Sequence, residues 1–191
     1  YSVVDNNFPP TPLGNKSLLC DEERYADRNQ YYLLEKAGVP YPQQFLNYED
    51  IDRLVIVKVP EVERSFERGF FFAHTPDDFK RKVDMMLDEG KLTQKGLEQA
   101  IIEEFIIGPT VNLNFFYSPI FERLELLGTD TRRQTNLDGL LRLPASQQLE
   151  IARTGIRPKF EEAGHIACTV LESMLEQIYD LGERFVKTAR E

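Results

Sequence analysis

Residues 101–150 read IIEEFIIGPTVNLNFFYSPIFERLELLGTDTRRQTNLDGLLRLPASQQLE and are the most informative part of the chain. It opens with two carboxylates, Glu103 and Glu104, inside an apolar segment that ends at Gly108. Further along, charged and amide side chains crowd between apolar segments, namely Asp130, Arg132, Arg133, Asn136 and Asp138. Polar groups among core-forming strands need hydrogen-bonding partners. The stretch therefore predicts a binding site built on strands.

Short apolar runs predict the strands. Ile101–Ile107 is almost wholly apolar, Val111–Tyr117 alternates apolar and amide residues, and Leu124–Leu127 is a further strand. Leu54–Val59 is a buried strand, and Phe70–Ala73 follows it after a charged loop. The last two strands and their loop predict a hairpin.

Capping signals and 3.6-residue periodicity predict the helices. One spans Asp21–Ala37 and ends at Gly38, and a short one spans Thr93–Ala100. Another begins at Thr75-Pro76 and ends at Gly90. A long C-terminal helix should present one apolar face, made of Val170, Leu171, Met174, Leu175, Ile178, Leu181 and Phe185. The fold class is α+β, a mainly antiparallel sheet with packed helices.

Composition excludes some function classes. The chain has 191 residues, 41% hydrophobic and 29% charged, and its net charge of −9 argues against nucleic-acid binding. No apolar run is long enough for a membrane span, and the start, which lacks Met, shows no signal-peptide pattern. Cys20 and Cys168 fit free thiols in a reducing compartment. We expect a cytoplasmic protein without membrane partners.

Lys58 ends a buried strand, so its ammonium group needs an anion. A nucleotide phosphate is one candidate, and a snorkelling side chain or a structural ion pair is the other. Glu103 and Glu104 point to opposite sides of their strand, so they are not expected to act as an acid–base pair. One could face a cleft while the other faces solvent or a lysine.

Arg132, Arg133 and Asn136 are placed after a strand end, where two guanidinium groups and an amide suit a phosphorylated ligand. The alternative is a solvated loop with Asp130 as the internal partner. His74 and His165 lie far apart in the sequence, and neither a zinc site nor a Ser-His-Asp arrangement is expected. The sequence contains no P-loop and no GxGxxG motif.

The order of a lysine strand, a charged hairpin loop, the FFFA strand and the segment IEEFIIG resembles the ATP-grasp fold. Within it, the chain is similar to the archaeal formate-dependent 5-formaminoimidazole-4-carboxamide ribonucleotide synthetase family. The segments that carry this resemblance are LGNKSLL, ERGFFFA, IEEFIIG, FFYSP, LELLGTD, RRQTNLDGLLRLPASQQLE and LESMLEQIYDLGERFVKTARE. It runs from about Phe8 to Glu191 and is most specific over Phe115–Glu150.

The resemblance implies an enzyme of purine (IMP) biosynthesis that uses ATP, Mg²⁺ and formate. It would formylate 5-aminoimidazole-4-carboxamide ribonucleotide through formyl phosphate. By position, the resemblance places Lys58 and Arg28 at the nucleotide phosphates, and Glu103 with the backbone of Glu104 and Ile106 at the adenine edge. Asn136 matches the ribonucleotide-binding asparagine, and Arg133 stands beside it. No catalytic residue and no metal ligand is assigned.

The resemblance also implies an organisation. Residues 1–20 would be a linker from an absent N-terminal domain, 21–107 the small ATP-grasp lobe, and 108–191 part of the large lobe. The acidic Mg²⁺ ligands would follow residue 191. The hairpin loop, which is glycine-rich in the family, here reads VPEVERSFERG with three glutamates.

Two alternatives stay open. The altered loop favours a divergent ligase that joins another carboxylate and amine. A non-catalytic assembly protein on the same fold is the other. The family implies a homo-oligomer, to which apolar side chains of FFYSP could contribute.

Overall fold

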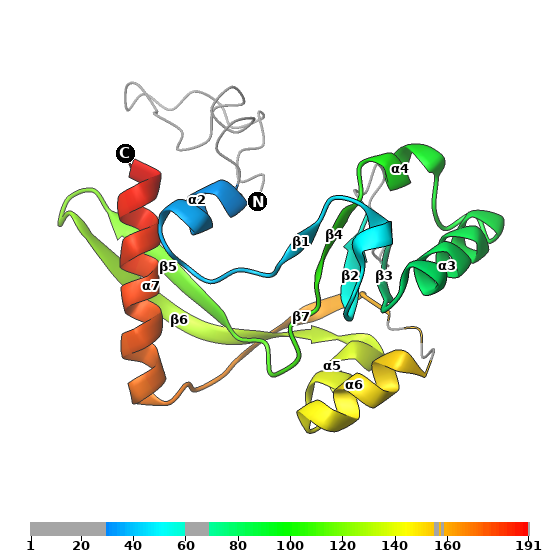
Figure 1. Cartoon of the computed structure of the whole chain (residues 1–191). Coiled ribbons are helices and arrows are strands. Elements are labelled where there is room, and N and C mark those ends of the chain that lie inside the picture. The colour runs from blue at the N-terminus through cyan, green and yellow to red at the C-terminus, as the bar shows by residue number, and fades with distance from the viewer. Residues whose placement is uncertain (1–29, 60–68, 155–156, 158, 191) are drawn as a thin grey trace, which may run out of the picture.

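The computed structural model describes residues 30–59, 69–154, 157 and 159–190, and only the backbone of 133–136 and 162 (Figure 1). The predicted α+β class is confirmed: helices pack on two antiparallel sheets. The elements are α2 Gln30–Lys36, β1 Gln44–Phe45, η1 Tyr48–Asp50, β2 Val55–Lys58, β3 Phe70–Ala73, α3 Pro76–Asp88, α4 Gln94–Glu98, β4 Ile101–Glu104, β5 Asn112–Ser118, β6 Arg123–Gln134, α5 Thr135–Leu141, α6 Ala145–Arg153, β7 Glu162–Ala167 and α7 Glu172–Arg190.

The first sheet has the order β1-β4-β2-β3, with every neighbouring pair antiparallel. The predicted hairpin is confirmed, because β2 pairs with β3 in the register Val57↔Phe71. Its loop, residues 60–68, lies outside the described residues. The strand predicted over 101–107 ends earlier, at Glu104. After Phe105, whose N–H donates to the carbonyl of Leu54 at 2.9 Å, the neighbouring strands have ended.

The second sheet has the order β5-β6-β7, and it corrects the sequence interpretation. The strand predicted over Leu124–Leu127 extends to Gln134, because β5 pairs with its first part and β7 with its second. Arg132 and Arg133 therefore lie within a strand, and Asn136 lies in the first turn of α5. They do not follow a strand end in a loop.

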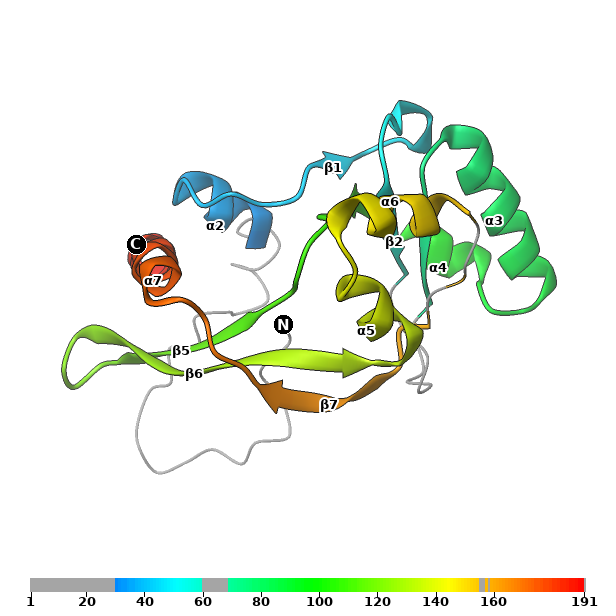
Figure 2. The same ribbon diagram turned by 90° about the horizontal axis from the view of Figure 1, so that it is seen from below.

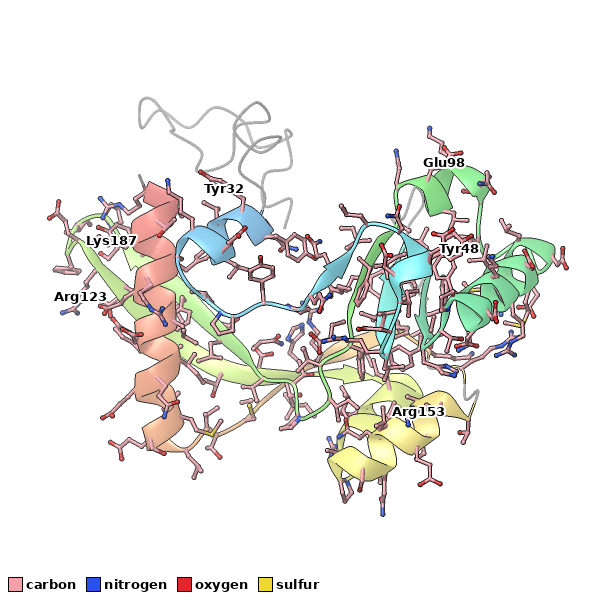
Figure 3. The ribbon with its side chains drawn as sticks, viewed as in Figure 1. Tyr32, Tyr48, Glu98, Arg123, Arg153 and Lys187 are labelled. Atoms are coloured by element: carbon pink, nitrogen blue, oxygen red, sulfur yellow. The ribbon has the colours of Figure 1, made fainter. Side chains whose placement is uncertain are left out.

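Helices cover both faces of the first sheet (Figures 1 and 2). On one face, Val55, Val57 and Phe71 pack with apolar residues of α3. On the other, one cluster joins the sheet to α5, α6 and the segment before β7, and contains Leu54, Ile56, Phe72, Leu137, Leu140, Ala152 and Phe160. Figure 3 shows Tyr48 beside α3, where its ring stacks on Phe79 with centroids 5.1 Å apart. The second cluster thus ties the first sheet to the helices that follow β6 and to the segment that leads into β7.

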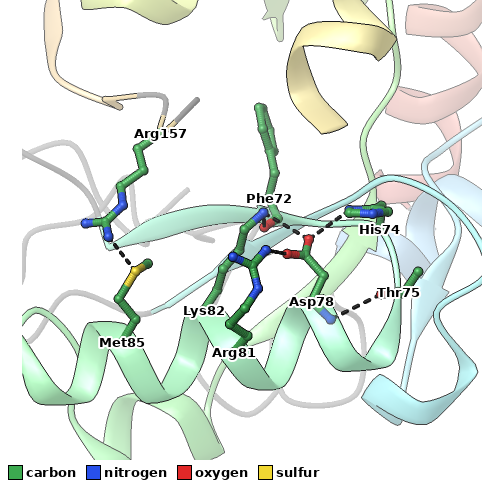
Figure 4. Close-up of polar contacts among 8 residues, drawn as sticks. All are labelled: Phe72, His74, Thr75, Asp78, Arg81, Lys82, Met85 and Arg157. Carbon is green, nitrogen blue, oxygen red and sulfur yellow. Dashed lines mark hydrogen bonds and ion pairs between the residues drawn. The ribbon is translucent and has the colours of Figure 1, made fainter. Parts of the chain in front are cut away.

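The predicted start of α3 is confirmed in detail (Figure 4). The N–H of Asp78 donates to Oγ1 of Thr75 at 3.1 Å, and Pro76 occupies the first helical position. Gly90 adopts φ +67° just after the helix, a conformation that glycine accepts without strain. The predicted helix over 93–100 is also present, as α4 with Thr93 as its cap.

The C-terminal helix α7 packs on the hairpin of β5 and β6. It begins at Glu172, so the prediction that Val170 and Leu171 belong to its apolar face was wrong, and Leu171 is exposed. In the first part of the chain, α2 ends at Lys36, one residue before the predicted end, and the predicted stop Gly38 follows with φ +63°. Residues 21–29 of the predicted helix lie outside the described residues. Within the described part, no helix combines the length and the apolar character that crossing a bilayer demands.

Candidate functional site

A cleft of about 810 Å³ lies between the two sheets. One side is formed by β2, β3 and β4, and the other by the start of β5, the second half of β6, and α5. Four residues that the sequence predicts at the nucleotide line this cleft, namely Lys58, Glu103, Glu104 and Ile106. The structure thus brings distant segments together at one place. The role of each residue toward a nucleotide stays a prediction.

Lys58 and Glu103 form an ion pair inside the cleft. Lys58 belongs to β2 and Glu103 to the neighbouring β4, where both side chains share one face of the sheet. The Lys58 side chain is 36% exposed and that of Glu103 only 7%. The structural ion pair considered as an alternative for Lys58 is therefore present, and the ammonium group still reaches the cleft.

A second donor reaches Glu103 from α2. The hydroxyl group of Tyr31 donates to Oε2 of Glu103 at 2.5 Å, while Lys58 contacts the other oxygen, Oε1. Burial, and then the hydrogen bond to Glu103, raise the pKa of Tyr31 to about 12. The phenol thus remains a proton donor at neutral pH. Tyr31 could not be predicted from the sequence, because nothing in a helical pattern marks a tyrosine that reaches a strand 72 residues away.

Glu104 points away from Glu103, as expected for neighbours in a strand. Its carboxylate lies 3.7 Å from Nη1 of Arg53. Its backbone N–H donates to the carbonyl of Gln43 at 2.7 Å, so a contact of this N–H with a base would have to replace that bond. Ile106 is 58% exposed where it lines the cleft.

The opposite side of the cleft carries cations. Arg132 of β6 and Arg142, just after α5, both line it. Arg142 pairs with Asp138 at 3.3 Å, and Asp138 also faces the cleft. Two guanidinium groups opposite Lys58 suit an anionic ligand between the sheets.

Three predicted residues fall outside what the structure describes. Arg28 is outside the described residues altogether. For Arg133 and Asn136 only the backbone is described. Arg133 is the chain neighbour of Arg132, and Asn136 is the chain neighbour of Leu137; Arg132 and Leu137 both line the cleft.

A polar cluster around Asp130 adjoins the cleft. The Asp130 carboxylate accepts hydrogen bonds from the amides of Asn112 at 2.8 Å and Asn114 at 2.7 Å, and lies 2.7 Å from Nδ1 of His165. These contacts, that of Asn112 first, hold the pKa of Asp130 well below its usual range. The sequence suggested Asp130 as an internal partner of Arg132 and Arg133. Its described partners are the amides of Asn112 and Asn114 and the ring of His165. The i, i+2 spacing of the asparagines was the signal that could have revealed the cluster.

Within the described part of the chain, no three His, Cys, Asp or Glu side chains gather to hold a metal ion. Cys168 lines the cleft as a free thiol, as expected, and Cys20 lies outside the described residues.

Known proteins resemble this chain over nearly its whole length. It is 38% identical over 189 residues to the 5-formaminoimidazole-4-carboxamide-1-(beta)-D-ribofuranosyl 5'-monophosphate synthetase of Methanopyrus kandleri. It is 36% identical over 188 residues to the synthetase of the same name from Methanocaldococcus jannaschii. Both alignments cover 98% of this chain and 50% of the relative, so the chain spans about half the length of these curated relatives.

A solved structure of an IMP biosynthesis protein PurP from Thermococcus kodakaraensis matches with 30% identity and a TM-score of 0.49. That match covers 83% of this chain and 41% of the PurP chain. A family model described as a domain of unknown function, DUF1297, matches residues 78–191. Since this is more than half of the chain, the chain belongs to the DUF1297 family and is a homologue of these synthetases.

Proposed function

We propose that this chain forms the central part of an ATP- and formate-dependent ligase with an ATP-grasp fold. The enzyme formylates 5-aminoimidazole-4-carboxamide ribonucleotide in IMP biosynthesis. The carrying observation is the cleft in which Lys58 and Glu103 of one sheet face Arg132 and Arg142 across from them. Identity of 36–38% to proteins named as synthetases of the formylated product supports the choice of substrate.

The chemistry follows from the weakness of formate as an electrophile. Its oxygen attacks the γ-phosphorus of ATP, the bond to ADP breaks, and formyl phosphate forms. The ribonucleotide amine then attacks the formyl carbon, phosphate leaves, and the amine loses a proton. Such transfer depends mainly on positioning and on neutralising phosphate charge.

The residues of this chain can supply part of that neutralisation. Lys58 is the candidate for the nucleotide phosphates, and Glu103 with the backbone of Ile106 for the adenine edge. Asn136 and Arg133 are the candidates for the ribonucleotide. Mg²⁺ would supply further charge neutralisation, and we assign no ligand for it among the described residues.

The test uses the complete natural protein that contains this chain. We expect ADP release to require both formate and the aminoimidazole ribonucleotide, each omitted in turn. Lys58→Ala should raise the apparent KM for ATP about tenfold or more, and Asn136→Ala should instead raise the KM for the ribonucleotide. ADP release that ignores both co-substrates would contradict the proposal. Equal effects of either variant on the two substrates would contradict the assigned roles.

A second candidate function rests on the loop between β2 and β3. This loop carries three glutamates, Glu61, Glu63 and Glu67, whose negative charges would repel a triphosphate. Its two arginines, Arg64 and Arg68, would offset part of that repulsion. A ligase that acts on a different carboxylate and amine fits this loop. ADP release with another carboxylate and none with formate would favour it. Neither the homo-oligomeric state nor the cytoplasmic location is needed for the proposal, and both stay predictions.

A further inference from the structure

Glu103 is a buried carboxylate held from two sides. Lys58 contacts Oε1, and the Tyr31 hydroxyl group donates to Oε2. A buried carboxylate that loses its cation without another donor carries a large desolvation penalty. Two donors on different oxygens mean that one can leave while the other stays.

Helix α2 is placed to hold Tyr31 there. Its first residue, Gln30, lines the cleft, and so does Pro42 further along the same segment. The end of the helix is fixed to α7, because Nη1 of Arg184 donates to the carbonyl of Gly38 at 2.9 Å. The ring of Tyr31 packs edge-on against Tyr41, with centroids 6.1 Å apart. Tyr31 is therefore held beside the cleft, next to its lining residue Gln30.

A phosphate-binding role for Lys58 creates a conflict in the cleft. An ammonium group that turns toward a triphosphate must weaken its contact with Glu103, whose side chain is only 7% exposed. Because Tyr31 donates to the other oxygen, its hydrogen bond does not have to break when Lys58 turns away. It also fixes the direction of the second oxygen, which sets where Glu103 can accept a hydrogen bond from a ligand.

We propose that Tyr31 is a positioning residue of the nucleotide site: its hydrogen bond holds the Glu103 carboxylate in place when Lys58 transfers from Glu103 to the nucleotide phosphates. This inference rests on the proposed nucleotide-binding function. The high pKa of Tyr31 agrees with it, because a phenol that stays protonated can donate throughout the neutral range.

The test measures MgATP affinity by calorimetric titration of the complete natural protein. Tyr31→Phe should weaken MgATP binding about tenfold, the size expected for one hydrogen bond to a charged group. The affinity for the ribonucleotide should stay within twofold, which separates positioning from general disruption. The matched control is Tyr41→Phe, which removes the hydroxyl group of the tyrosine packed on Tyr31 and has no described contact to Glu103; it should leave both affinities unchanged.

A double-mutant cycle decides whether Tyr31 acts through Glu103. In a Glu103→Gln background the side chain is neutral, so adding Tyr31→Phe should change MgATP affinity less than twofold. If Tyr31→Phe binds MgATP with wild-type affinity, or if the tenfold loss is the same in both backgrounds, the role of Tyr31 is overturned while the proposed function stands. A wild-type protein that binds no MgATP would overturn the proposed function and this inference with it.

Discussion

Asp78 is a buried carboxylate in the first turn of α3 with three cationic or ionisable neighbours (Figure 4). Lys82 lies 2.9 Å away, His74 lies 2.8 Å away, and Arg81 donates a hydrogen bond. Lys82 also donates to the carbonyl of Phe72 at 2.9 Å, so the group joins α3 to β3. One carboxylate thereby organises the junction of a strand and a helix.

Asp78→Asn should lower the free energy of unfolding by about 1–3 kcal/mol, because it leaves half-buried cations without their counter-charge. Urea unfolding followed by circular dichroism measures the change. The control is Asp77→Asn, which removes an exposed carboxylate from the same helical turn. It should cost only a few tenths of a kcal/mol. Equal losses in the two variants would contradict this account of Asp78.

The effect of Asp78 should also depend on pH. Burial works to raise the pKa of Asp78, but hydrogen bonds and charges from Lys82, Arg81 and His74 outweigh it and lower the pKa. A lowered pKa in the folded state gives stability that is full above the unfolded value, about 3.9, and is lost as pH falls through the folded pKa. The difference between wild type and Asp78→Asn should thus be constant near neutrality and shrink below about pH 4. Urea unfolding at a series of pH values measures this stability difference. If the difference between the two proteins grows as the pH falls, the pKa of Asp78 is raised by folding and not lowered.

Elements bounded by local signals were predictable from the sequence. The Thr75 cap, the glycine stops at Gly38 and Gly90, and the apolar β2 and β3 all act within a few residues. The full length of β6 was not predictable, because Gly128 and Asp130 have low strand propensity and no apolar alternation continues past them. They adopt a strand because β5 and β7 supply hydrogen-bonding partners from other parts of the chain. Long-range pairing overrode local propensity.

Two helical glycines should respond differently to replacement by alanine. At Gly139 in α5 an added Cβ meets nothing within 4 Å, so Gly139→Ala should stabilise the fold by about 0.5–1 kcal/mol. At Gly182 in α7 the same Cβ would lie 2.9 Å from Cδ2 of Leu124 and 3.0 Å from the ring of Phe115. Overpacking of about 1–3 kcal/mol should cancel or exceed the gain in helix propensity there.

Thermal and urea unfolding of the two alanine variants measure this difference. A stabilising Gly182→Ala as large as that of Gly139→Ala would mean that α7 does not sit closely on β5 and β6. The comparison therefore tests the docking of the C-terminal helix independently of any ligand.

At the scale of the whole molecule, the sequence predicted which residues form the site better than how they meet. Lys58 and Glu103 could be expected near a cleft from their place in apolar strands. Their ion pair depends on the register of β2 and β4, which single-strand patterns do not specify. The Asp130–His165 contact likewise needs β7, a short strand containing Gly164 whose pairing with β6 brings two distant residues together.

A small aromatic group joins the first sheet to the segment that leads into β7, and two of its rings line the cleft. Phe160, in the segment before β7, is 3% exposed and packs edge-on against Phe70 at 5.5 Å and Phe72 at 5.7 Å between centroids. Phe160→Ala should lower the free energy of unfolding by about 3–5 kcal/mol, through lost burial and the cavity left behind. Because Phe160 and Phe70 line the cleft, the variant should also weaken MgATP binding in the complete protein.

Phe121→Ala is the matched control for this prediction, since Phe121 is 68% exposed at the turn between β5 and β6. It should change the free energy of unfolding by less than about 0.5 kcal/mol. Urea unfolding and calorimetry of both variants at low protein concentration provide the two measurements. A Phe160 variant that loses stability but keeps full MgATP affinity would show that the cleft does not depend on this aromatic group. Losses in both quantities, with Phe121→Ala unchanged, are expected if the aromatic group shapes the cleft around the ligand.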